Sequence, residues 1–150
     1  MIIDANLQFD PTGTAVTATG PSTNVIDLGT ARDMGIDDDG LEVFCIVQQT
    51  FTAAGAATLT VQVQSSVDNS TFNTLVESAA IPVAKLTLGT EILRCKLPAD
   101  QPALTAGIGR YLRLEYVVAT GPFTAGKVQA ALVLDRQANI AYPPGVVVSN

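Results

Sequence analysis

The sequence contains no histidine and no tryptophan, and only 8 of its 150 residues are basic. Histidine is the commonest general base at neutral pH and the commonest metal ligand, so its absence excludes a Ser-His-Asp triad and most zinc sites. Fourteen acidic residues leave a net charge of −6, which argues against a nucleic-acid partner, because nucleic-acid-binding proteins present a basic face to phosphate. We therefore expect a protein that is not an enzyme and that uses no metal and no cofactor.

Long apolar runs and closely spaced cysteines are also missing. No stretch reaches about 18 consecutive apolar residues, so the sequence predicts no transmembrane helix and no membrane partner. Residues 1–4 lack the basic and apolar regions of a signal peptide, so we expect no secretory signal here. Cys45 and Cys95 lie in apolar segments 50 positions apart, which is no metal-binding spacing. We expect two buried, unpaired thiols, with a disulfide between them as the alternative.

What the sequence does contain is hydrophobic alternation with a period of two, which is typical of half-buried strands. It is clearest in Thr58–Gln64, Tyr111–Val118 and Lys127–Asp135, whereas Leu41–Gln48 is almost entirely apolar and suits a central strand covered on both faces. Weaker strand candidates are Ala15–Thr19, Asn24–Leu28, Thr71–Glu77 and Glu91–Leu97.

Turn-forming residues separate these strands, notably at Asp10–Gly13, Asp37–Gly40 and Asp68–Ser70. About eight strands without a helical period indicate an all-β fold, an antiparallel sandwich or barrel, and we favour a jelly-roll-like β-sandwich with extended terminal arms. The expected divisions are residues 1–9 as an N-terminal arm or edge strand, 10–136 as the sandwich and 137–150 as an extended C-terminal arm. Val146, Val147 and Val148 should pack either as a last strand of the same sandwich or on another subunit's sheet.

Two further patterns are candidates for binding. Asp37, Asp38 and Asp39, with Asp33 nearby, form the densest acidic cluster, but their spacing does not match a calcium loop. They favour a solvated turn or a contact with a partner's basic residues. Aromatic residues make up only 5% of the chain and do not cluster along it, so the aromatic platform of a sugar-binding module is not evident.

Several motifs follow one another along nearly the whole chain: Met1–Ala5 with Leu7–Phe9, Ser22–Gly29 with Ala31–Gly35, Val63–Ser66 with Asp68, Asn69 and Phe72, Arg110–Leu114, and Gly121–Gly126. In this order and spacing they resemble the capsid cement, or decoration, proteins of short-tailed bacteriophages. The resemblance implies a jelly roll on the outside of an icosahedral head, with the phage major capsid protein as its partner. It also implies a virion protein that is assembled in the host bacterial cytoplasm and joins neighbouring capsomers without covalent links.

On this reading, the terminal arms and the acidic cluster are the expected contacts with the capsid or with another subunit. Apolar arm residues would offset the entropy lost when an arm becomes ordered, and the acids would steer docking to basic residues. The residues are Ile2, Ile3, Asp33, Asp37, Asp38, Asp39, Tyr142, Val146, Val147 and Val148. Symmetric seams between capsomers favour a homo-oligomer, a dimer before a trimer. The alternative is a phage receptor- or carbohydrate-binding module.

Overall fold

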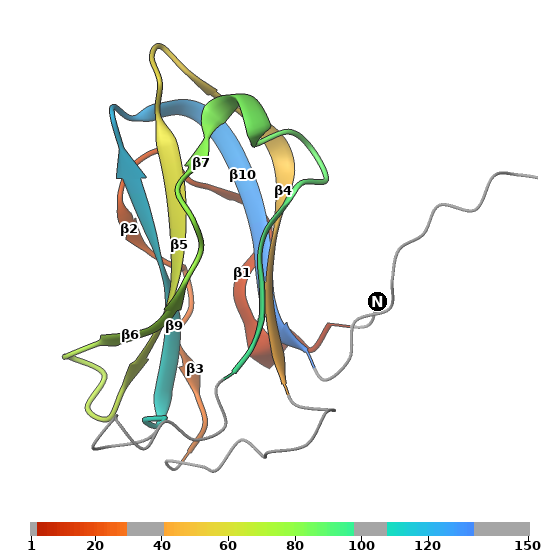
Figure 1. The fold of residues 1–150 in the computed structure, drawn as a ribbon. Helices are drawn as coiled ribbons and strands as arrows, with labels where there is room; N and C mark the ends of the chain where they lie inside the picture. The colour runs from red at the N-terminus through yellow and green to blue at the C-terminus, as the bar shows by residue number, and fades with distance from the viewer. Residues whose placement is uncertain (1–2, 30–40, 98–107, 134–150) are drawn as a thin grey trace, which may run out of the picture.

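Two antiparallel β-sheets face each other across an apolar core in the computed structural model, which describes residues 3–29, 41–97 and 108–133 (Figure 1). Sheet A has the order β1 (Gln8–Ala15), β10 (Phe123–Val133), β4 (Glu42–Ala53) and β8 (Glu91–Lys96). Sheet B has the order β2 (Gly20–Pro21), β9 (Tyr111–Ala119), β5 (Thr58–Ser66) and β6 (Asn73–Glu77). Two short strands extend sheet B, β3 (Ile26–Asp27) on β9 and β7 (Ile81–Pro82) on β5, and two 3-10 helices are η1 (Ala5–Leu7) and η2 (Val83–Lys85). The predicted antiparallel β-sandwich is confirmed.

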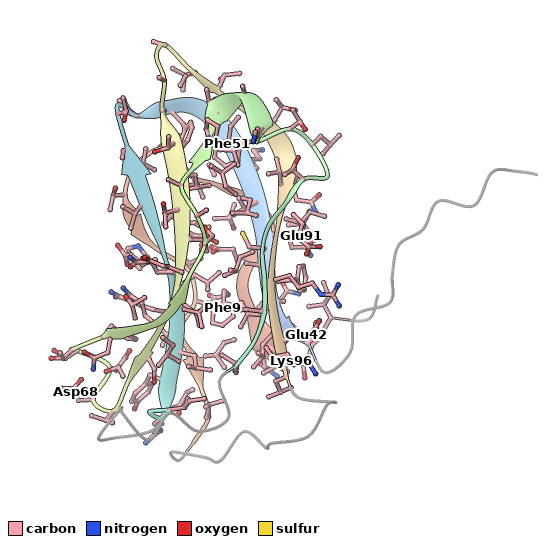
Figure 2. The ribbon with its side chains drawn as sticks, in the orientation of Figure 1. Phe9, Glu42, Phe51, Asp68, Glu91 and Lys96 are labelled. Carbon is pink, nitrogen blue, oxygen red and sulfur yellow. The ribbon has the colours of Figure 1, made fainter. Side chains whose placement is uncertain are left out.

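The core lies between the two sheets, as the alternation of apolar and polar residues in the strands predicted (Figure 2). Leu59, Val61 and Val63 of β5 are fully buried, and the polar residues between them lie on the other face of the strand. Within the core, the rings of Phe51 and Phe123 pack edge to face, with their centroids 4.9 Å apart. The period of two thus predicted correctly which face of β5, β9 and β10 turns inward.

β4 is a central strand, as its continuous apolar sequence predicted. It lies between β10 and β8, and alternate residues face the main core. Phe44 points to the opposite, outer face of sheet A, where it is nevertheless buried. A second small apolar cluster therefore lies outside the sandwich core.

The beginning of the chain differs from the prediction. Asp10–Gly13 is not a turn but part of β1, and Ala15–Thr19 is not a strand, because β1 already ends at Ala15. β1 is an edge strand whose register with β10 shifts twice, between Gln8 and Asp10 and between Asp10 and Thr14. An irregular edge strand accommodates proline and glycine, since one side of β1 has no sheet partner among the described strands.

Both cysteines are free, as expected. Cys45 is buried in the core, and burial raises the pKa of its thiol to about 12. Cys95 is only partly buried. None of the helices in residues 3–29, 41–97 and 108–133 is long and apolar enough to span a membrane.

Candidate interaction surfaces

An open groove of about 380 Å³ lies between the N-terminal segment and the loop that joins β2 to β3. Next to the lining residue Ala5, the Asp4 carboxylate caps η1, because its Oδ1 accepts a hydrogen bond of 2.8 Å from the Asn6 N–H. The groove is lined by Ala5, Asn6, Gln8, Thr23, Asn24 and Val25. None of these six residues is charged, so the surface is polar but neutral.

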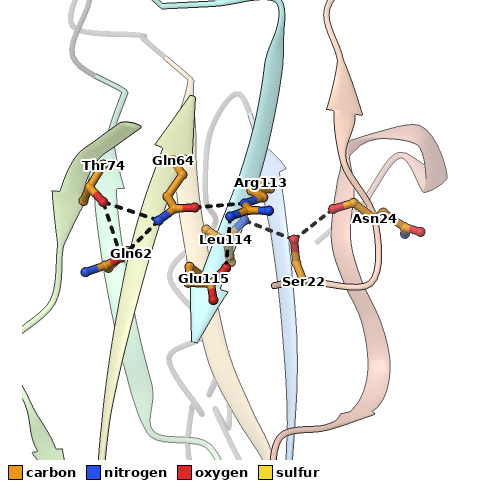
Figure 3. A network of polar contacts seen from close by, with 8 residues as sticks. All are labelled: Ser22, Asn24, Gln62, Gln64, Thr74, Arg113, Leu114 and Glu115. Carbon is orange, nitrogen blue, oxygen red and sulfur yellow. Dashed lines mark hydrogen bonds and ion pairs between the residues drawn. The ribbon is translucent and has the colours of Figure 1, made fainter. Parts of the chain in front are cut away.

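The loop side of the groove is held against both sheets. Ser22 exchanges backbone and hydroxyl hydrogen bonds with Leu114 of β9, and its hydroxyl also donates to the Asn24 carbonyl at 2.9 Å (Figure 3). The Asn24 N–H donates to the Phe9 carbonyl at 2.9 Å, and its side-chain amide donates to the Gln8 carbonyl at 3.1 Å. The loop is therefore fixed in position although residues 23–25 are exposed.

Beneath this loop lies a buried carboxylate. Asp10 of β1 is 0% exposed; its Oδ1 accepts from the Thr23 N–H at 2.9 Å and its Oδ2 from the Tyr116 hydroxyl at 2.6 Å. Burial raises the pKa of Tyr116 well above its ordinary range, and Cys45 and Asp10 raise it further. The tyrosine therefore remains protonated as a donor, and the carboxylate links β1, the groove loop and β9.

The outer face of sheet A carries the second apolar cluster. Phe44, Ala131 and Val133 are buried there, and Ile3 and Ile46 pack against them. Of the predicted contact residues, Ile3 is the one that the structure describes, and it lies against this chain's own sheet. Its role in a contact with another protein stays a prediction.

The outer face of sheet B is polar and ordered (Figure 3). The Arg113 guanidinium lies 3.9 Å from the ring centroid of Phe72, and its Nε donates to Gln64 Oε1 at 2.9 Å. Glu115 Oε2 is 3.3 Å from Arg113 Nη2; this buried oxygen forms an ion pair but no hydrogen bond of good geometry. Gln62 and Thr74 continue the network across β5 and β6. These side-chain contacts join β9, β5 and β6 across the outer face of sheet B.

The other predicted contact residues lie outside the described residues: Ile2, Asp33, Asp37, Asp38, Asp39, Tyr142, Val146, Val147 and Val148. The groove residues were not predicted, because short polar loops resemble solvated turns in sequence. The sequence carried one indication of the groove: most of its lining residues belong to two of the motifs that carry the family resemblance, Met1–Ala5 with Leu7–Phe9 and Ser22–Gly29. Within the described ranges, no group of three or more cysteine and acidic side chains is placed to hold a metal ion.

Comparison with known proteins gives one family. No curated protein matches the sequence. The Bbp16 family matches residues 11–132, from within β1 to the next-to-last residue of β10. This match covers most of the chain, and the chain therefore belongs to the Bbp16 family, which is associated with bacteriophages.

Proposed function

We propose that this chain is a structural virion protein, a cement protein that binds the outer surface of a bacteriophage head. In this role it clamps neighbouring major capsid protein subunits against the pressure of the packaged DNA. The observation that carries the proposal is membership of a phage-associated family over residues 11–132, which include nearly the whole sandwich. The chain performs no reaction in this proposal, and it acts through stiffness and adhesion.

The architecture supports a clamping role. Two sheets that share one apolar core move as a unit, so a load on one side of the sandwich is transmitted to the other. A body bound to two neighbouring capsomers forms its second contact at high effective concentration. Their separation then requires the loss of both contacts, and modest energies add up over many copies.

The strand order supports the jelly-roll form of the sandwich. If β2 with β3 and β6 with β7 each count as one interrupted strand, the main strands follow the order 1-8-3-6 in sheet A and 2-7-4-5 in sheet B. Successive strands thus alternate between the sheets at both ends of the chain, as in a double-sheet jelly roll.

The C-terminal arm is proposed to contribute to attachment. Ordering ten residues costs roughly 10–20 kcal/mol of backbone entropy, so the arm must bury apolar side chains to remain in place. Deleting Tyr142–Asn150 should leave a folded protein that binds heads poorly, as measured by circular dichroism and by co-sedimentation. Full affinity of the truncated protein would rule out this use of the arm.

The decisive experiment is a reconstruction of intact particles of the phage that encodes the chain, together with co-sedimentation of the purified chain and heads lacking it. We expect a fixed, high copy number on the capsid exterior at seams between capsomers, as a dimer in preference to a trimer. Virions without the chain would refute the proposal. Glycan binding by the isolated protein, without binding to heads, would favour the receptor- or carbohydrate-binding alternative.

A further inference from the structure

We propose that the neutral groove between η1 and the β2–β3 loop binds an extended, uncharged segment of the major capsid protein, which we call the shell protein. The side-chain carboxamides of the groove would form hydrogen bonds with the backbone of that segment. This inference rests on the proposed function and names the surface through which the sandwich itself, apart from its arms, would make contact. Its residues are those that line the groove: Ala5, Asn6, Gln8, Thr23, Asn24 and Val25.

The first argument is preorganisation. Backbone groups of residues 22–24 are bonded inward, to Leu114, Asp10 and Phe9, while the side chains of Thr23, Asn24 and Val25 remain exposed. A surface loop held in this way loses little conformational entropy when a partner binds. Loops positioned by a rigid scaffold are common binding elements for this reason.

The second argument is the set of groups presented to a partner. The Asn6 and Gln8 carboxamides and the Thr23 hydroxyl make no side-chain hydrogen bond within the described structure, and neither does the Oδ1 atom of Asn24. Carboxamides both donate and accept, which matches the alternating N–H and C=O groups of an extended backbone. The exposed side chain of Val25 adds an apolar contact at the rim.

The lining also disfavours other ligands. A phosphate or carboxylate needs cationic donors, and a sugar usually stacks on an aromatic ring, but the six lining residues include neither. The nearest acid in sequence, Asp4, is occupied as the cap of η1. The proposed function supplies one occupant that suits this uncharged lining, the shell protein, and a second copy of this chain is the outcome that the test distinguishes from it.

The test uses the full chain and heads of the encoding phage from which this chain has been removed. A double variant, Asn6→Ala with Thr23→Ala, removes two unpaired hydrogen-bonding groups, and Val25→Arg blocks the rim. Matched controls on other exposed positions are Thr17→Ala with Asn73→Ala, and Val67→Arg. Circular dichroism and thermal melting establish that each variant is folded, and co-sedimentation at two salt concentrations measures binding.

We expect each groove variant to bind about ten-fold more weakly or worse, with the controls unchanged. For the double variant, which leaves the net charge unchanged, the loss should be equal at low and high salt because the groove is neutral. A photocrosslinker at position 6 should join the chain to the shell protein. Groove variants that bind like the wild type, or crosslinks only to a second copy of the chain, would overturn the inference and leave the cement function standing. Failure of the wild type itself to bind heads would overturn both.

Discussion

Replacing Tyr116 with phenylalanine tests whether the buried carboxylate holds the sandwich together. The change removes a single oxygen, the donor to Asp10 Oδ2 at 2.6 Å, and leaves the ring in place. Asp10 is fully buried, so no water can replace the lost donor without entering the core. A hydrogen bond to a charged group contributes about 1.5–3 kcal/mol, and we expect a loss of unfolding free energy of that size.

The assay is equilibrium unfolding in urea and by heat. For a domain of this length the expected loss corresponds to a melting temperature lower by roughly 3–12 °C and a urea midpoint lower by about 1 M. Tyr111→Phe is the matched control, because Tyr111 lies on the same strand and no hydrogen bond is found for its hydroxyl within the described structure. It should change the unfolding free energy by less than about 0.5 kcal/mol.

A double-mutant cycle separates the hydrogen bond from the loss of packing. If Asp10 and Tyr116 act through one bond, Asp10→Ala combined with Tyr116→Phe should be less destabilising than the sum of the single changes, by about 1 kcal/mol or more. Additive effects, or a Tyr116→Phe variant as stable as the wild type, would refute the proposed link between the sheets.

Three further predictions concern pH, backbone and charge. Stability should fall as pH rises above about 9, because unfolded cysteine and then unfolded tyrosine ionise while Cys45 and Tyr116, whose pKa values are raised by burial, stay protonated. The Tyr116→Phe variant should lose the tyrosine's share of this slope, at most about 1.4 kcal/mol per pH unit above about pH 10 in pH-dependent unfolding, and keep the share of Cys45. Gly126→Ala should destabilise by about 2 kcal/mol or more in thermal melts, because φ is +153° and the added Cβ would collide with the Phe51 ring, whereas Gly55→Ala meets no neighbour and should be neutral. Replacing Asp37–Asp39 with asparagine should weaken head binding chiefly at low salt; equal losses in a salt titration would exclude electrostatic steering.

The fold was predictable because its long strands carry a local signal. In β9, and in β5 as far as Val63, every second residue is apolar, and burial between two sheets is the physical cause of that alternation. The pattern predicts the direction of a side chain but not what covers it. Gln64 points outward as expected, yet it is only 8% exposed, in a network with Arg113 that the Phe72 ring covers.

The candidate site was not predictable, because its residues are related only through tertiary structure. Asp10 precedes a proline and resembles a turn residue, and its partner Tyr116 lies 106 positions later. Asn6 and Asn24 line one groove because the β2–β3 loop bonds to the Gln8 and Phe9 carbonyls, a pairing without any periodic signature. The acidic cluster and the C-terminal valines, which the sequence did single out, lie outside the described residues, so their roles stay predictions.

The buried carboxylate and the exposed groove belong to one arrangement. A joint replacement of Asp10 and Tyr116 by apolar side chains would fill the core without a desolvation penalty, and paired substitutions of that kind are often neutral or stabilising. It would, however, offer no acceptor to the Thr23 N–H, which Asp10 Oδ1 holds at 2.9 Å, and the loop would lose its anchor to the core. Because Asp10 accepts hydrogen bonds from both Tyr116 and Thr23, it fixes the position of the β2–β3 surface loop relative to the core. Its stabilising effect on the sandwich and the shape of the groove follow from the same two hydrogen bonds.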